Sequence, residues 1–261
     1  MSNNRRLLED LAAGRITIDE AEQKIRGFNL DRVGDLALLD IDRDARGGVP
    51  EVVMAVTKTA ADVTDIVTRL LEIKGFAVVS RLDSEKLYAL RSALGDDQVR
   101  IYGREPAITA IVHTPQWKPP SSSGRIALIT AGTSDIPYAD EARVIAEVLG
   151  VDVLVFTDVG VAGIHRLIEP MKKIVEADVD AIVVFAGMEG ALPTVVAALV
   201  DIPVIGVPVP VGYGFGGKGE TALASMLQSC SPGLAVVNIG NGIGAGAVAS
   251  LIALRANRKR P

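Results

Sequence analysis

The chain has 261 residues, of which 49 % are apolar and only 4 % aromatic, a profile typical of parallel sheets built from branched aliphatic strands. The net charge of −5 and the pI near 5.2 exclude the basic surface of a nucleic-acid-binding protein. A single cysteine excludes an internal disulfide, and the charged N-terminus and the lack of an uncharged 18-residue span argue against secretion or membrane insertion, so we expect a cytoplasmic protein.

The first half of the chain, residues 1–115, reads as a small α+β domain. Apolar spacing predicts helices over 3–13, 19–27, 59–73 and 84–94. Thr17 and Glu20 have the spacing of a capping box for the second of them. Short apolar runs predict strands over 36–39, 52–56, 76–80, 99–102 and 108–112, with a polar loop at 40–50. Prolines and serines then mark a linker at 116–124.

From residue 125 to 261 strands and helices alternate regularly. The strands read IALIT, VDVLVF, AIVVFAG, PVIGVPV and LAVVNIG, and helices are expected over 137–149, 165–175, 191–200, 220–228 and up to about 257. Five strands alternating with five helices predict an α/β fold with a five-stranded, parallel, doubly wound sheet of the flavodoxin type. Ligands of such sheets bind beyond the carboxyl ends of the strands. Candidate site residues therefore follow each strand directly.

Polar residues follow the first two strands of this domain. The group after the first strand fits a helix cap or a cradle for phosphate or ribose. After the second strand, an arginine fork suits phosphate or carboxylate, and the histidine beside it is either structural or catalytic. These residues are Gly132, Thr133, Ser134 and Asp135 after the first strand, and His165 and Arg166 after the second.

The third and fourth strands are followed by an acidic turn and a glycine-rich loop. Gly187, Met188 and Glu189 open a helix, where the acid is favoured by the helix dipole or serves as a general base. The loop GYGFGGKGE, which contains Gly214 and Lys218, fits either close backbone approach to a phosphate or a flexible surface loop. It is not a P-loop, because no Ser or Thr follows the lysine.

The single cysteine, Cys230, precedes the fifth strand in the sequence LQSCSPG. A lone cysteine is more often a small buried apolar residue. Its place between a helix end and a turn makes a nucleophile the alternative. The glycines after the fifth strand match a dinucleotide-binding pattern only in part, and close packing of the last helix explains them.

In this order, the motifs resemble the aminoimidazole ribonucleotide carboxylase/mutase (PurE) family. They are Ser134-Asp135, His165-Arg166, Ala186-Gly187 with Leu192-Pro193, and PVIGVPV at 203–209. Where that family has a second histidine before Leu-Pro, this chain has Ala191, and the long N-terminal half is additional. Over nearly its whole length the chain resembles the LarB family of nickel-pincer cofactor biosynthesis. That resemblance rests on Asp42-Arg43, Arg46, Gly48, 50–53, Lys58 and Arg81, then AGTSD, DVGVAGIHR, AGMEGALP, VPVGYG and the cysteine with Ser-Pro-Gly.

The LarB resemblance implies a carboxylase and phosphoanhydride hydrolase. Its substrates would be nicotinic acid adenine dinucleotide (deamido-NAD) and CO2 or bicarbonate, and its products pyridinium-3,5-biscarboxylic acid mononucleotide and AMP. Cys230 would add transiently to the pyridinium ring, and Glu189 or Asp135 would take the ring proton. Ser134, His165, Arg166 and Lys218 would hold phosphates and the carboxylate, and Arg43, Arg46 and Lys58 the adenylate end.

The resemblance leaves the metal, the assembly and two other functions open. Mg²⁺ would help to cleave the anhydride, but the sequence has no dedicated metal motif, and no tightly bound organic cofactor is expected. Purine-type carboxylases form octamers, so a homo-octamer is expected. The alternatives are a purine-pathway carboxylase acting on aminoimidazole ribonucleotide and a nucleotide-binding module without catalysis. Neither requires a reactive cysteine.

Overall fold

The computed structural model describes residues 3–26, 29–104 and 107–257. The chain divides into two compact units, Met1–Arg100 with Ile111–Trp117, and Ile101–Ala110 with Lys118–Pro261. The break after Trp117 lies inside the stretch predicted as a linker. None of the described helices is long and apolar enough to cross a lipid bilayer.

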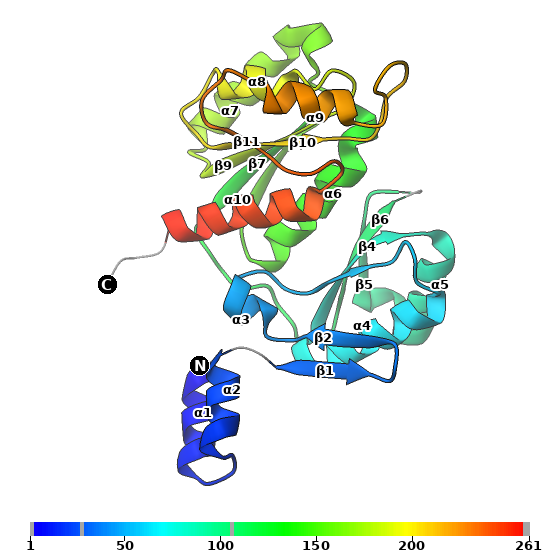
Figure 1. The fold of residues 1–261 in the computed structure, drawn as a ribbon, viewed down its shortest axis with the longest axis vertical. Coiled ribbons are helices and arrows are strands. Elements are labelled where there is room, and N and C mark those ends of the chain that lie inside the picture. The colour runs from blue at the N-terminus through cyan, green and yellow to red at the C-terminus, as the bar shows by residue number, and fades with distance from the viewer. Residues whose placement is uncertain (1–2, 27–28, 105–106, 258–261) are drawn as a thin grey trace. The chain divides into compact units, whose positions relative to one another are not determined.

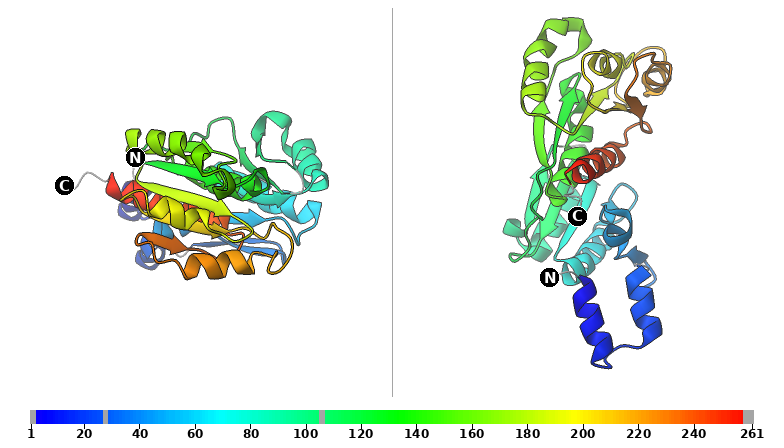
Figure 2. Two further views of the ribbon diagram at one scale, coloured as in Figure 1. Left: turned by 90° about the horizontal axis from the view of Figure 1, so that it is seen from above. Right: turned by 90° about the vertical axis from the view of Figure 1, so that its left-hand side faces the viewer.

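The first unit opens with two side-by-side helices, α1 (Asn3–Ala12) and α2 (Ile18–Arg26), drawn in dark blue in Figure 2. The predicted capping box is confirmed, because the Thr17 backbone N–H donates to Glu20 Oε2 at 2.8 Å and the Glu20 N–H donates to Thr17 Oγ1 at 3.2 Å. Each contact satisfies a donor that the helix itself leaves unpaired.

Two elements of the first unit were not predicted. Strand β1 (Leu30–Val33) pairs antiparallel with β2 (Ala37–Asp40), and a short helix, α3 (Arg43–Gly47), lies within the expected polar loop. Helix α3 ends at Gly48, which adopts a φ of 74° that glycine reaches without a steric penalty.

The remaining elements of the first half form a four-stranded sheet with two helices. Helix α4 (Ala60–Lys74) begins at a capping box between Thr59 and Asp62 and packs against α5 (Ser84–Leu94), which is followed by the turn η1 (Asp96–Gln98). The strand order is β3-β4-β6-β5. The strands are β3 (Val52–Met54), β4 (Phe76–Leu82), β5 (Val99–Tyr102) and β6 (Ile108–His113).

The second unit contains the predicted five-stranded parallel sheet, in the order β11-β10-β9-β7-β8 (Figure 1). The fold class is therefore confirmed. The strands are β7 (Arg125–Thr130), β8 (Asp152–Phe156), β9 (Ala181–Ala186), β10 (Val204–Pro208) and β11 (Leu234–Val236). Between and after them lie η2 (Thr133–Asp135), α6 (Ile136–Val148), η3 (Val161–Leu167), α7 (Ile168–Glu176), α8 (Leu192–Ala197), α9 (Glu220–Leu227) and α10 (Gly242–Ala256).

Helices cover both faces of this sheet. One apolar core joins Ala127 and Val184 of the strands to α7, α8 and α9, and the other joins Leu128 and Phe185 to α6 and α10. Successive strand residues point to opposite faces, so strands covered on both sides are apolar throughout. That explains why their apolar runs were readable from the sequence.

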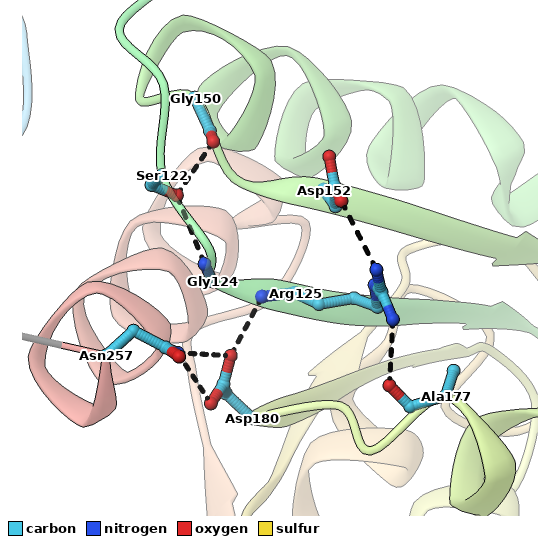
Figure 3. A network of polar contacts seen from close by, with 8 residues as sticks. All are labelled: Ser122, Gly124, Arg125, Gly150, Asp152, Ala177, Asp180 and Asn257. Atoms are coloured by element: carbon cyan, nitrogen blue, oxygen red, sulfur yellow. Dashed lines mark hydrogen bonds and ion pairs between the residues drawn. The ribbon is translucent and has the colours of Figure 1, made fainter.

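A polar network closes the amino-terminal edge of the sheet (Figure 3). Asp180, just before β9, accepts a hydrogen bond from the Arg125 backbone N–H at 2.8 Å and two from Asn257 Nδ2 at 3.0 Å. Ser122 Oγ donates to the Gly150 carbonyl at 2.8 Å. These bonds connect the end of the linker, two strands and the end of α10. The network therefore lies at the edge opposite the carboxyl ends of the strands, where ligands of such sheets bind.

Candidate active site

A cavity of about 450 Å³ lies at the carboxyl edge of the second sheet. Its lining comes from the loops that follow β7, β8, β9 and β10. The chain reverses direction across the sheet between β7 and β9, and ligands of doubly wound sheets bind at this kind of switch point. The volume is within the range of small-molecule sites.

Asp135 is the buried acid of the cavity. Its side chain is 4 % exposed, and Oδ2 accepts a hydrogen bond from the Gly132 N–H at 2.8 Å. Burial raises the pKa of Asp135 to about 6, although the backbone N–H groups of Gly132 and Ala131 act in the opposite direction. A carboxyl with such a pKa can both accept and return a proton near neutral pH.

Arg166 is a cation that lines the cavity, and two neighbours bind its guanidinium. Its Nη1 lies 3.1 Å from Asp158 Oδ2, and its Nη2 donates to the Gly160 carbonyl at 3.5 Å. A Cβ at Gly163 would lie 2.8 Å from Arg166 Nε, so another residue there would make the guanidinium shift. Asp158 adopts a left-handed φ of 58°, and its N–H donates to Thr130 Oγ1 at 3.3 Å.

The turn after β9 forms a wall of the cavity and carries its second acid, Glu189. The Gly190 N–H donates to the Gly187 carbonyl at 2.9 Å, and Met188 adopts a φ of 52°. A Cβ on Gly187 would lie 2.2 Å from the Val211 carbonyl oxygen. This turn and the loop after β10 therefore pack more closely than any other residue at position 187 would allow.

Tyr213 lines the cavity but was missed in the sequence analysis. It follows β10 and is 81 % exposed. Gly214 and Lys218 of the same loop, which the sequence predicted as site residues, do not line the cavity. An aromatic residue in the loop that follows a parallel strand was the signal that could have identified it.

The structure brings about half of the predicted site residues together. Those that line the cavity are Gly132, Ser134, Asp135, Arg166, Gly187, Met188 and Glu189. Thr133 lies beside them in the first loop but is not part of the lining.

His165 is not brought to the cavity. It is exposed and lines a separate, largely apolar hollow together with Ile164, Ile168 and other residues of η3 and α7. Successive residues of a 3₁₀ helix point about 120° apart, so Arg166 reaches the cavity while the side chain before it does not. His165 and Arg166 are therefore adjacent in the sequence but do not line the same cavity.

Cys230 lies outside the cavity, on the loop between α9 and β11. It is exposed, so the interpretation as a buried apolar residue is wrong. Both of its neighbours bind Thr194 of α8, because Thr194 Oγ1 donates to Ser229 Oγ at 3.0 Å and Ser231 Oγ donates to the Thr194 carbonyl at 3.0 Å. These bonds fasten the loop that carries Cys230 to α8, and Cys230 is not among the residues that line the cavity.

The predicted adenylate-binding cations of the first unit already have partners there. Arg43 lies 3.5 Å from Glu51, Arg46 pairs with Asp40, and Lys58 Nζ donates to the Met54 carbonyl at 3.0 Å. Their role in substrate binding stays a prediction. Among the described residues there is no cluster of three or more His, Cys, Asp or Glu side chains that could hold a metal ion.

Comparisons with known proteins cover both halves of the chain. Residues 125–259 match the AIR carboxylase family, and residues 31–111 match the LarB/PurE-like N-terminal domain. An uncharacterized protein of Methanocaldococcus jannaschii is 42 % identical over 96 % of this chain and 97 % of its own length. The N5-carboxyaminoimidazole ribonucleotide mutases of M. jannaschii and Thermotoga maritima are 35 % and 32 % identical, each over 49 % of this chain and over 76 % and 74 % of their own lengths.

Proposed function

The chain belongs to the AIR carboxylase family, in the LarB architecture with its additional N-terminal domain, and from this premise we propose that it is a carboxylase of nickel-pincer cofactor biosynthesis. The reaction converts deamido-NAD, water and CO2, or deamido-NAD and bicarbonate, to pyridinium-3,5-biscarboxylic acid mononucleotide and AMP, with water cleaving the phosphoanhydride. The observation that carries the proposal is a cavity lined by Asp135, Glu189 and Arg166, because it combines proton acceptors with an anion-binding fork.

One position of the cavity argues against the purine reaction. Ala191 lines the cavity where the purine enzymes have their second histidine. The purine substrate carries its own enamine-type carbon, which attacks CO2 directly. A pyridinium ring is electron-poor and cannot do so, and therefore it needs an added nucleophile.

Cys230 supplies that nucleophile in this proposal. Its thiolate adds to a ring carbon, which turns the pyridinium into a dihydropyridine with a nucleophilic carbon. That carbon attacks CO2 and forms the new C–C bond. Asp135 or Glu189 then accepts the ring proton, and the thiolate leaves with the electron pair of the C–S bond, so the ring becomes aromatic again. Arg166 and Ser134 hold the phosphate or the new carboxylate.

The position of Cys230 adds a requirement to this mechanism. Because both neighbours of Cys230 are bound to Thr194, we propose that the sulfur enters the cavity of a neighbouring copy rather than that of its own chain. Exposed Leu227 precedes the loop, and apolar groups left in solvent commonly mark an interface. This arrangement agrees with the expected homo-octamer.

The proposed function is tested with the purified protein, deamido-NAD, bicarbonate and Mg²⁺, followed by mass analysis. We expect AMP and a dicarboxylated mononucleotide. Cys230→Ser should abolish both products. If wild type and Cys230→Ser instead carboxylate aminoimidazole ribonucleotide equally well, the chain is a purine-type enzyme. Binding of deamido-NAD by wild type without any product would make it a binding module.

A further inference from the structure

Tyr213 and Met188 stand out in the cavity because they are large, partly apolar side chains that the chain leaves open to solvent. We propose that they form the face that holds a positively charged aromatic ring, and that Tyr213 makes the site selective for such rings over neutral ones. This inference rests on the proposed function, which names a pyridinium as the reacting ring.

The exposure of Tyr213 is the first observation. Only 4 % of the residues of this chain are aromatic, and Tyr213 is the one aromatic residue among the described residues that line the cavity. The residue is 81 % exposed although it lines the cavity. An aromatic ring gains most of its stabilising contacts from another flat or apolar group, and within the described residues no ring contact of Tyr213 is present.

The close approach of this segment to its neighbours is the second observation. A Cβ on Gly217 would lie 3.0 Å from the Tyr213 Cα and N, so the loop folds back directly under Tyr213. A Cβ on Gly212 would lie 3.2 Å from Met188 Sδ. The thioether of Met188 therefore packs against the residue that precedes Tyr213, and both side chains belong to one wall of the cavity.

The charges of the residues that line the cavity determine whether a cationic or a neutral ring binds better beside Tyr213 and Met188. Among the described residues, two carboxylates, Asp135 and Glu189, line the cavity together with a single cation, Arg166. Asp158 lies 3.1 Å from that cation and already balances its charge. The face of a tyrosine ring attracts cations, and a thioether makes favourable contacts with aromatic rings. A cationic ring is therefore stabilised here by the π face and by the carboxylates, while a neutral ring of the same shape gains only the packing.

Two mononucleotides separate the charge of the ring from its shape. Nicotinic acid mononucleotide has a pyridinium ring, and its dihydropyridine form has a neutral ring with the same ribose and phosphate. Their dissociation constants are measured by calorimetry with the full-length protein. We expect wild type and Tyr213→Phe to prefer the pyridinium form, and Tyr213→Leu to lose about 2- to 30-fold of that preference, the range of a cation–π contact.

Phe215 provides the matched control, because it lies two residues further along the same loop, is fully exposed and does not line the cavity. Phe215→Leu should leave the preference unchanged. The inference is overturned if Tyr213→Leu keeps the wild-type preference or if Phe215→Leu loses as much of it.

The outcomes distinguish a failure of this inference from a failure of the proposed function. If wild type carboxylates deamido-NAD but shows no preference that depends on Tyr213, only the inference is wrong. If the preference depends on Tyr213 but no carboxylated product forms, the ring-binding face stands and the proposed reaction does not.

Discussion

Arg166 Nη1 lies 3.1 Å from Asp158 Oδ2, so the cation that lines the cavity is held by an acid that does not line it. The same acid has a left-handed backbone, with a φ of 58°, that few residues other than glycine, asparagine and aspartate adopt. Asp158 is therefore expected to act through Arg166, as a residue that orients the guanidinium towards an anionic part of the substrate.

Asp158→Asn should raise the KM for deamido-NAD about two- to fivefold and change kcat less, because an exposed ion pair contributes at most about 1 kcal/mol. Asparagine tolerates the left-handed backbone, so only the charge is lost. Asp178→Asn is the control, since Asp178 also has a left-handed φ, of 49°, but is not part of the cavity. Equal effects of the two variants on KM would refute the positioning role.

Gly187→Ala should distort the wall between the turn after β9 and the loop after β10. The added Cβ would lie 2.2 Å from the Val211 carbonyl oxygen, which is a backbone atom with little freedom to move. We expect a loss of about 1–3 kcal/mol in the free energy of unfolding, measured by urea denaturation, and a loss of carboxylation. At Gly132, in the same cavity, a Cβ would have its nearest contact at 3.9 Å from Asp135 Oδ2. Gly132→Ala should therefore leave the stability nearly unchanged, and an equal loss would contradict the steric explanation.

Titration of Asp135 should lower the free energy of unfolding as the pH rises from about 4 to about 6. Burial raises its pKa from 3.8 to about 6, so in this window the unfolded chain releases the proton while the folded protein keeps it. Stability then decreases with pH, by about 3 kcal/mol in total for a shift of this size, and is constant above the folded-state pKa.

The measurement compares urea denaturation of wild type and Asp135→Asn between pH 4 and pH 7. Asparagine keeps an oxygen that can accept the Gly132 N–H but does not titrate. The free-energy difference between the two proteins should shift in favour of Asp135→Asn as the pH rises. Parallel stability curves would show that Asp135 has an ordinary pKa.

The fold of the second unit could be predicted because each of its strands is buried on both faces or bounded by clear turns. β7 contains and β9 consists of a short apolar run rich in branched residues, and the length of these runs and the turns beside them favour strands. Strand β1 was missed because it is only four residues long, and two of these, Asp31 and Arg32, are charged. Asp31 pairs with Arg69 of α4, and this contact between distant parts of the sequence leaves no local pattern.

The sequence could predict only those site residues whose position follows from the end of a strand. Asp135, Arg166 and Glu189 were found because parallel strands bring their carboxyl ends to one edge. The direction of a side chain depends on local geometry that spacing does not reveal, as the contrast between His165 and Arg166 shows. For Cys230, the decisive contacts are those of its neighbours with Thr194, 35 and 37 positions away in the sequence.

Mixed oligomers test whether Cys230 acts in the cavity of another copy. Cys230→Ser lacks the nucleophile, and the double variant Asp135→Asn/Glu189→Gln lacks both proton acceptors, so each protein alone should be inactive. If the sulfur crosses between copies, some sites in a mixed oligomer combine an intact cavity with an intact neighbouring cysteine. Random mixing in equal amounts should then restore about a quarter of the wild-type activity, since each of the two requirements is met in half of the subunits of a symmetric assembly.

If the sulfur acts within its own chain, no site in the mixture is complete and the activity stays at the level of the separate variants. The two proteins must be co-expressed or refolded together. Otherwise, subunits that fail to exchange between oligomers would also leave the mixture inactive. Mass analysis of the intact assembly establishes that both variants are present in one oligomer. Inactivity in assemblies of proven mixed composition would mean that the loop held by Thr194 opens and delivers Cys230 to its own cavity, or that the ring is activated without this cysteine.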